Sequence, residues 1–136
     1  MTNRTLVIIK PDAVSRGLIG AILQRYESKG LEIVAMEQRM VSVELSDAHY
    51  AEHVEKDFYP NLRQFITSGP AVALVLAGRD VISVVRAMHG ASDPVAAAPG
   101  TIRGDFGLDK TQNLVHGSDS EESAVREITL WFPGLA

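Results

Sequence analysis

Residues 71–77 read Ala-Val-Ala-Leu-Val-Leu-Ala, the most apolar strand-like stretch of the 136-residue chain. A short continuous apolar run of this kind, bounded by Gly69-Pro70, is typical of a buried strand. A second such run, RTLVII at residues 4–9, ends at Lys10-Pro11 because proline lacks the donor that a β-ladder needs. The two runs predict two buried strands, one of them at the start of the chain.

The remaining segments alternate between helical and extended patterns. Residues 17–30 carry apolar side chains at helical spacing and end at Gly30, whereas residues 31–43 are partly alternating and β-branched, as in a strand or a long hairpin arm. Local start and stop signals predict the other elements: short helices after Ser46 and after Asn61, a helix from Asp80 to Gly90, a short strand at 114–116, and a last helix that opens with a Ser118-x-x-Glu121 capping box and ends at Pro133-Gly134.

The order β-α-β-(αα)-β-α-β-α predicts an α+β fold. We expect a ferredoxin-like βαββαβ antiparallel sheet with an inserted helical pair and a C-terminal helix, in one domain over residues 1–136. A doubly wound parallel sheet is the alternative. Residues 90–111 show no sustained period, and a loop of this length inside a compact domain is usually functional or disordered.

Composition restricts the function. The net charge of −4 and the ordinary share of charged residues argue against a general nucleic-acid-binding surface, so any polyanion must meet a local cluster of cations. The chain has no cysteine, which excludes disulfides, thiolate zinc sites and a cysteine nucleophile, and makes the cytoplasm the expected location. The apolar runs are too short for a signal peptide or a membrane span, so we expect no membrane association.

One short motif points to a metal. His49, Glu52 and His53 match the H-x-x-E-H pattern, which on a helix puts two imidazoles on one face. A catalytic zinc usually needs a third protein ligand and a cleft, and the expected helix is only about two turns long. We therefore favour a solvated amphipathic helix here and assign no protein-held metal.

His116 lies in the stretch NLVHGSDS at residues 113–120, just before the last helix. Much of an imidazole is neutral at pH 7, so a histidine that faces a cleft can act as a nucleophile when its other nitrogen is held by an acceptor. Glu127 interrupts the apolar face formed by Ala124, Ile128 and Trp131, and is a candidate for that acceptor. A surface glutamate at the edge of the apolar face is the alternative.

Phosphoryl transfer also needs positive charge around the transferred group. Lys10 ends a strand, Arg86 lies off the apolar face of its helix, and Arg103 lies in a glycine-bounded loop. Three cations from distant segments could converge on one phosphate. Taken singly, however, Arg86 is more typical of a residue that complements its helix C-terminus, and Lys10 and Arg103 are more typical of solvated surface residues; composition does not overturn this.

Three motifs together resemble nucleoside diphosphate kinase. They are TLVIIKPD at residues 5–12, PGTIRGDF at 99–106 and N-x-x-HGSD at 113–119, and the resemblance extends from Arg4 to Pro133. It implies a ping-pong reaction of low base specificity: His116 would take the γ-phosphoryl group of a nucleoside triphosphate as a phosphohistidine and pass it to a nucleoside diphosphate.

The resemblance also implies the roles of further residues. Glu127 would orient the imidazole, and Tyr50 would form a supporting hydrogen bond near the phosphate, behind the residues that contact it directly. Mg²⁺ would be bound through the nucleotide phosphates, and Phe58 would stack on the base. Contacts to the phosphates would come from Arg86, Arg103 and Ser92, and contacts to the sugar hydroxyls from Lys10 and Asn113, with Lys10 also reaching the transferred phosphate.

The sequence departs from the family pattern at three positions. Ser92 stands where threonine is usual, Ala13 where glycine is common, and Asp57 where proline is frequent. The resemblance implies a homo-oligomer, hexamer or tetramer. The alternative function is a non-catalytic ferredoxin-like module that binds nucleotide or single-stranded nucleic acid, although four Phe, three Tyr and one Trp provide few aromatic side chains for an extended nucleic-acid surface.

Overall fold

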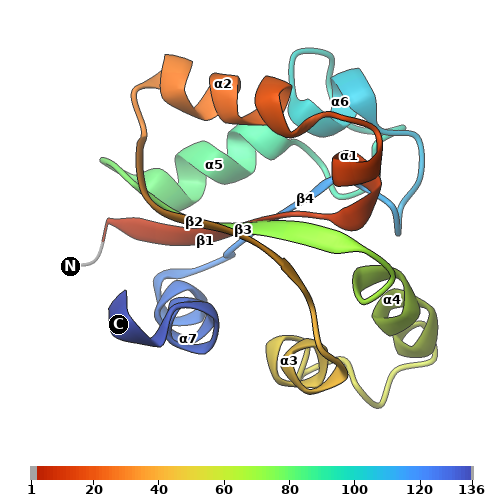
Figure 1. The fold of residues 1–136 in the computed structure, drawn as a ribbon. Coiled ribbons are helices and arrows are strands. Elements are labelled where there is room, and N and C mark those ends of the chain that lie inside the picture. Colours follow the sequence, from red (N-terminus) through yellow and green to blue (C-terminus); the bar gives the residue numbers. More distant parts are fainter. Residues whose placement is uncertain (1–2, 136) are drawn as a thin grey trace.

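A four-stranded sheet lies at the centre of the structure (Figure 1). The computed structural model describes residues 3–135. The sheet has the strand order β2-β3-β1-β4, and every neighbouring pair is antiparallel. The strands are β1 (Arg4–Ile9), β2 (Glu32–Met40), β3 (Pro70–Ala77) and β4 (Val115–Gly117). The ferredoxin-like α+β prediction is confirmed, and the doubly wound parallel alternative is wrong.

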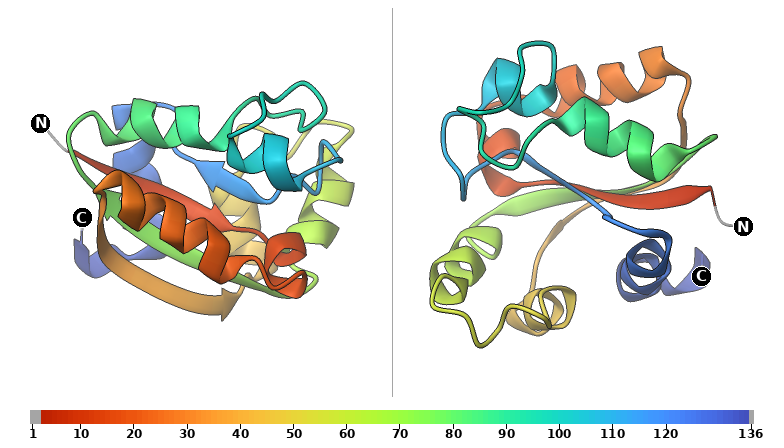
Figure 2. Two further views of the ribbon diagram at one scale, coloured as in Figure 1. Left: turned by 90° about the horizontal axis from the view of Figure 1, so that it is seen from above. Right: turned by 180° about the vertical axis from the view of Figure 1, so that it is seen from behind.

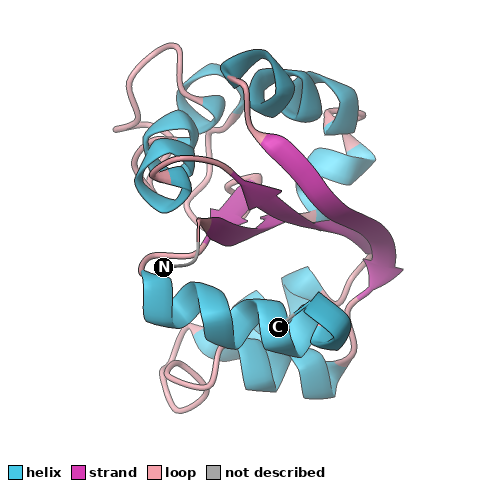
Figure 3. Ribbon diagram, turned by 90° about the vertical axis from the view of Figure 1, so that its left-hand side faces the viewer, coloured by secondary structure: helices cyan, strands magenta, loops and turns pink. Residues whose placement is uncertain are grey.

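Helices cover both faces of the sheet, as the views from above and behind show (Figure 2). On one face lie α2, α5 and α6, and on the other lie α3, α4 and α7, so that the sheet is enclosed between two helical layers (Figure 3). The bounds are α1 (Pro11–Ser15), α2 (Ile19–Lys29), α3 (Val43–His49), α4 (Tyr59–Ile66), α5 (Val81–His89), α6 (Ile102–Phe106), α7 (Glu121–Trp131) and the 3-10 turn η1 (Pro133–Leu135).

Side-chain alternation along the central strands creates two cores. On β1, Val7 and Ile9 pack into the core beneath α2 and α5, whereas Leu6 and Ile8 pack into the core beside α7. All four side chains are fully buried. The run at residues 4–9 is continuously apolar because both faces of the strand are covered, and β3 follows the same pattern.

Several helix ends differ from the sequence-based prediction. The helix expected after Ser46 begins earlier, because the hydroxyl of Ser42 accepts a hydrogen bond from the Leu45 amide and caps it. The helix expected after Asn61 begins at Tyr59, since Pro60 fits the first turn, where no amide donor is needed. Asp80 occupies the N-cap position of α5, but its side chain makes no capping hydrogen bond.

The last helix is also capped differently. Ser120 caps α7 by accepting a hydrogen bond from the Ser123 amide, so the capping box predicted from Ser118 is wrong. The helix ends at Trp131, before Pro133. Two α-helices were not predicted: α1, which Pro11 can open directly after β1, and α6, which lies within the expected 90–111 loop and has only five residues, too few for a helical period.

Within residues 3–135, no helix combines the length and apolar character that crossing a membrane requires.

Candidate active site

A cavity of about 500 Å³ opens beside β4, between the two helical layers. Its lining includes all nine residues that the sequence singled out: Lys10, Tyr50, Phe58, Arg86, Ser92, Arg103, Asn113, His116 and Glu127. These residues come from segments more than one hundred positions apart in the chain. The strand order explains the convergence, because β4 lies at the edge of the sheet next to β1, whose end carries Lys10.

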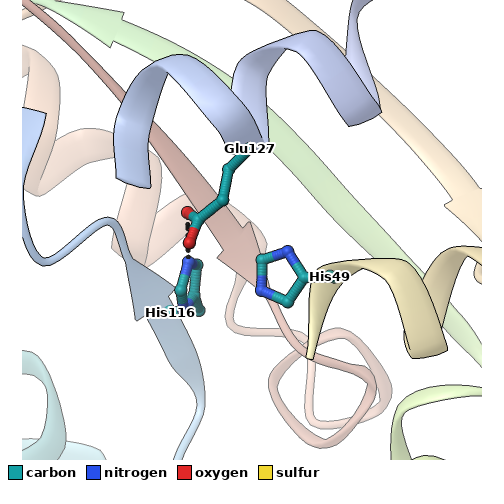
Figure 4. A group of neighbouring side chains, drawn as sticks. All are labelled: His49, His116 and Glu127. Carbon is teal, nitrogen blue, oxygen red and sulfur yellow. Dashed lines mark hydrogen bonds and ion pairs between the residues drawn. The ribbon is translucent and has the colours of Figure 1, made fainter. Parts of the chain in front are cut away.

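The side chains of His116, on β4, and Glu127, on α7, point toward each other (Figure 4). Nε2 of His116 lies 2.8 Å from Oε1 of Glu127, and the two side chains are 20% and 7% exposed. Val115 and Gly117 point to the opposite face of the strand, so alternation directs His116 towards α7. A proton on Nε2 satisfies the carboxylate and leaves Nδ1 unprotonated, with no hydrogen-bond partner among residues 3–135.

Ser118 fixes the carboxylate from a second side. Its hydroxyl donates to Oε1 of Glu127 over 2.7 Å and accepts a hydrogen bond from the Leu6 amide over 3.1 Å. Burial by itself would raise the pKa of Glu127, but the hydrogen bond from His116 and its electrostatic interaction with the carboxylate outweigh it and hold that pKa below its ordinary value. The carboxylate is therefore ionised at neutral pH, held by two donors.

His49 packs against His116, with ring centroids 4.7 Å apart. It is buried, and its Nδ1 accepts a hydrogen bond from Nε1 of Trp131 over 3.1 Å. Burial, followed by the charge of His116, lowers the pKa of His49 to about 3. Because an indole N–H only donates, the neutral His49 ring carries its proton on Nε2.

The predicted solvated helix for the H-x-x-E-H motif is wrong. The helix α3 ends at His49, whose side chain is buried, and His53 lies in the turns that follow. Burial and the helix end depend on packing against α7, which a local pattern does not record. The motif residues therefore do not share one helical face.

Spacing alone would allow a metal at His49, His116 and Glu127, whose donor atoms lie within 4.8 Å of one another. Both imidazoles, however, carry their protons on Nε2, because Trp131 donates to one ring and Glu127 accepts from the other. The lone pair of His49 therefore accepts the hydrogen bond from Trp131, and the lone pair of His116 lies on Nδ1, away from Glu127. The group acts as a hydrogen-bonded cluster.

Lys10 is the most buried cation of the cavity, at 7% exposed. Its Nζ donates to Oδ1 of Asn113 over 2.7 Å, and the Asn113 amide donates to the carbonyl of Ser92. Burial, reinforced by the positive charge of Arg103, lowers the pKa of Lys10 to about 8. The ammonium is thus poorly solvated and forms no close ion pair with a carboxylate within residues 3–135, although the charge of Asp12 partly offsets the lowering of its pKa; this favours an incoming anion.

Arg103 is held by the backbone around β4. Three of its nitrogens donate to the carbonyls of Asn113, Gly90 and Val115, over 3.1, 2.9 and 2.6 Å. Its position depends on α6, where the Thr101 hydroxyl caps the helix and a Cβ on Gly104 would collide with the Ala98 carbonyl. The residue order Thr-Ile-Arg-Gly is therefore a local requirement for aiming this guanidinium.

Cations outnumber carboxylates around the cavity. Arg86 is exposed and donates to the carbonyl of Gly117 over 3.3 Å. The cationic lining residues are Lys10, Arg86, Arg103, Lys110 and Arg126, and the acidic ones are Glu52, Asp119 and Glu127. The carboxylate of Glu127 is already hydrogen-bonded to His116 and Ser118. The excess of positive charge therefore suits the cavity to a polyanion.

Two aromatic residues line the cavity at different depths. Phe58 is 52% exposed, and its ring lies 5.8 Å from Nζ of Lys56. The Tyr50 hydroxyl is buried and has no hydrogen-bond partner among the described residues, and burial raises its pKa. A buried hydroxyl without a partner in a cavity is available to a ligand.

The three departures from the family pattern fall outside the hydrogen-bonded cluster. Ser92 is exposed at the cavity, Ala13 is fully buried within α1, and Asp57 is exposed before α4. Sequence reasoning missed Ser118 and His49 as parts of the site. Ser118 had a competing local explanation as a helix cap, whereas His49 was part of a motif that pointed to a metal.

Comparison with known proteins agrees with this geometry. A held imidazole that faces a cationic cavity is the arrangement of a phosphotransferase. The family model described as nucleoside diphosphate kinase matches residues 3–135, and the chain belongs to this family. It is thus an enzyme that transfers a γ-phosphoryl group from a nucleoside triphosphate to a nucleoside diphosphate, and nothing in the comparisons supports a non-catalytic module.

The similarity extends over the whole chain. The nucleoside diphosphate kinase of Nocardioides sp. is 66% identical over 135 residues, which covers 99% of this chain and 100% of that protein. The enzyme of Rhodococcus erythropolis is 63% identical, over 100% and 99% of the two chains. Among solved structures, a halophilic nucleoside diphosphate kinase from Halobacterium salinarum in complex with CDP superposes with a TM-score of 0.94 at 50% identity, over 97% of this chain and 88% of that one.

Proposed function

We propose that His116 is the residue that carries the phosphoryl group between the two nucleotides. The observation that carries this proposal is the hydrogen bond of its Nε2 to buried Glu127, which leaves the Nδ1 lone pair for a ligand in the cavity. A histidine held in this way by a carboxylate is an activated nucleophile.

The transfer balances without an additional reactant. The Nδ1 lone pair forms a bond to the γ-phosphorus while the bond from that phosphorus to the bridging oxygen breaks, and the nucleoside diphosphate leaves with the electron pair. The imidazole becomes a positively charged phosphohistidine whose Nε2 proton stays hydrogen-bonded to Glu127. A second nucleoside diphosphate then attacks the phosphohistidine and reverses the step.

Cations and hydroxyls around His116 would bind the phosphates. Arg86 and Lys10 would place positive charge beside the transferred group, and Arg103 would contribute the N–H groups that the backbone does not use. The Ser92 hydroxyl is exposed at the cavity, and the Tyr50 hydroxyl would gain in the ligand the partner that it lacks in the protein. Phosphoryl transfer depends mainly on such positioning and charge stabilisation.

The other end of the cavity would bind the nucleoside. Asn113 and Lys10 are hydrogen-bonded to each other and would contact the sugar hydroxyls. Phe58 would stack on the base, a contact that every base can make, which explains low base specificity. The CDP complex of the Halobacterium salinarum relative supports a nucleotide in the equivalent cavity.

Mg²⁺ would enter with the nucleotide phosphates. It prefers hard oxygen ligands, and the three-residue group with metal-ligand spacing in residues 3–135 contributes two imidazoles and an already occupied carboxylate. These residues fit a metal held by phosphate oxygens rather than a protein cage. When bound, the ion neutralises phosphate charge.

The expected homo-oligomer, hexamer or tetramer, is supported by the edge of the sheet. Within residues 3–135, strand β2 pairs only with β3, and its Met36 and Met40 are 53% and 58% exposed. A mass measurement under native conditions tests whether the protein is an oligomer, and a monomer would contradict this proposal.

We also infer a single domain and a cytoplasmic location, where nucleoside triphosphates are abundant.

The test of the nucleophile is transfer of label from a γ-labelled nucleoside triphosphate to the protein. We expect an acid-labile, base-stable adduct that an unlabelled diphosphate of another base discharges. His116→Ala should abolish it, whereas His53→Ala, which removes another histidine of the cavity, should retain it. Label that persists in His116→Ala would move the nucleophile to a different residue, and no adduct in the unmodified protein would contradict a phosphohistidine intermediate.

A further inference from the structure

A buried Tyr–His pair lies on the side of β4 opposite to the His116 side chain, and the phosphoryl transfer described above uses neither residue. Tyr26 belongs to α2 and His89 is the last residue of α5; the side chains are 0% and 1% exposed. The Tyr26 hydroxyl lies 2.6 Å from Nε2 of His89. The two polar groups are thus paired beside the hydrophobic core on this face of the sheet.

The His89 ring packs directly against Gly117, the residue after His116. A Cβ at Gly117 would lie 3.2 Å from Cε1 and 3.3 Å from Nδ1 of His89, so any larger residue would push the ring away by a few tenths of an ångström. Arg86, one turn earlier on α5, donates to the carbonyl of the same glycine. The end of α5 therefore holds the backbone beside His116 at two points.

The pair also fixes which nitrogen of His89 carries the proton. The buried Tyr26 hydroxyl has no other acceptor among the described residues, so donation to Nε2 is the arrangement that satisfies its proton. The neutral ring then has its proton on Nδ1, on the side of Gly117 and the cavity that His89 helps to line.

Groups that carry or can gain a positive charge lie near His89 on four segments. They are Arg103 of α6, His116 of β4, Arg86 of α5 and Lys10 at the end of β1. Burial first, and then these charges, lower the pKa of His89 well below its ordinary value. An imidazole that stays neutral can support the strand here without adding a further positive charge to the cavity wall.

We propose that Tyr26 and His89 are positioning residues for phosphoryl transfer: the phenol holds one neutral tautomer of His89, whose ring fixes Gly117 and thereby the distance of the His116 imidazole from the phosphate-binding cations. The proposal rests on the proposed role of His116. It concerns the rate of transfer and not binding of the nucleoside, because Phe58 and Asn113, which would contact the base and the sugar, lie outside α2 and α5. Misplacement of a reacting group by about 1 Å can slow a reaction by about 10²-fold.

The test separates transfer from binding in Tyr26→Phe and His89→Leu. We expect His116 to be phosphorylated about tenfold more slowly in single-turnover rapid-quench measurements with γ-labelled ATP, while the Kd for ADP from calorimetry stays within about twofold. Ile22→Val is the matched control: Ile22 lies one turn before Tyr26, is fully buried and does not line the cavity. It should weaken the core and leave the transfer rate unchanged.

Nitrogen-15 NMR of the histidine rings in the unmodified protein gives a second readout. We expect His89 to appear as the neutral Nδ1–H tautomer at pH 6, with that preference lost in Tyr26→Phe. An Nε2–H tautomer or a charged ring in the unmodified protein would overturn the proposal, even where a variant does not fold.

Unchanged transfer rates in both variants would also overturn the positioning role, as would equal slowing in Ile22→Val. Neither result would affect the assignment of His116, because that depends on loss of label in His116→Ala. Label that persists in His116→Ala would remove the basis of both proposals, and the two failures are therefore distinguishable.

Discussion

Nε2 of His116 and Oε1 of Glu127 are 2.8 Å apart, and the carboxylate is held there by a second hydrogen bond from Ser118. This relationship does more than orient a ring. When the imidazole accepts a phosphoryl group it becomes positively charged, and an ionised carboxylate that is already in place stabilises that charge without reorganisation. The effect is large because the site is mostly buried.

Glu127→Gln should therefore slow the phosphorylation of His116 by about 10²-fold while nucleotide binding changes little. The amide retains a hydrogen-bond acceptor but no charge to stabilise the phosphohistidine. Single-turnover labelling measures the rate. Glu122→Gln, on the exposed first turn of α7, is the control and should behave as the unmodified protein; equal rates in the two variants would refute an electrostatic role for Glu127.

Phe58→Ala should raise the KM for nucleotides of all four bases by about tenfold, with kcat nearly unchanged, because stacking is worth about 1–3 kcal/mol per base and does not depend on base identity. Steady-state kinetics with each diphosphate acceptor measure the effect. Val54→Ala, an exposed residue of the same segment that does not line the cavity, should leave KM unchanged. Loss confined to purines would contradict a base-tolerant stack.

Lys10→Met should stabilise the protein at pH 7 and slow phosphoryl transfer. Since the pKa of Lys10 is lowered to about 8 in the folded protein, the unfolded chain binds more protons between pH 8 and pH 10.5, and stability rises with pH across this window. The advantage of Lys10→Met should thus shrink by up to about 3 kcal/mol towards pH 10.5. Urea unfolding at several pH values measures it, with Lys29→Met, an exposed lysine, as control. A pH-independent advantage would show that burial of the charge is not its cause.

His49→Asn should make the protein more tolerant of acid. Because the pKa of His49 is lowered to about 3, its stabilising contribution is complete above pH 6.5 and is lost as the pH falls towards 3. The unmodified protein should lose about 2 kcal/mol more than the variant between pH 7 and pH 5. Asparagine retains an acceptor for Trp131 but does not titrate. Thermal unfolding at both pH values measures the difference, and His53→Asn should show no such gain.

Local sequence patterns were reliable where one interaction dominates. The runs at 4–9 and 71–77 predicted buried strands because both faces of each are covered, and Gly30 ended its helix in a left-handed conformation, φ 95°. Glu127 was recognisable because a carboxylate on an apolar helix face needs a partner. These inferences depend on spacing alone.

At Ser118 and His49, local spacing did not predict the hydrogen-bond partner. The Ser118 hydroxyl fits a helix cap by spacing, yet it turns inward to Glu127, and Ser120 caps the helix instead. His49 fits a metal-ligand spacing, yet α3 ends at this residue and its ring packs against His116 and Trp131. In both cases a residue distant in the chain determines the hydrogen bond.

The sequence by itself determined the order of the strands and of the longer helices, the buried strands and the residue types required for phosphoryl transfer. Only the tertiary structure decided which nitrogen of His116 is held, which hydroxyl supports Glu127, and that Lys10, 106 positions before His116, lies in the same cavity. The physical reason is that hydrogen bonds and charges act over a few ångströms in space, and sheet pairing between β1 and β4 sets those distances independently of separation along the chain.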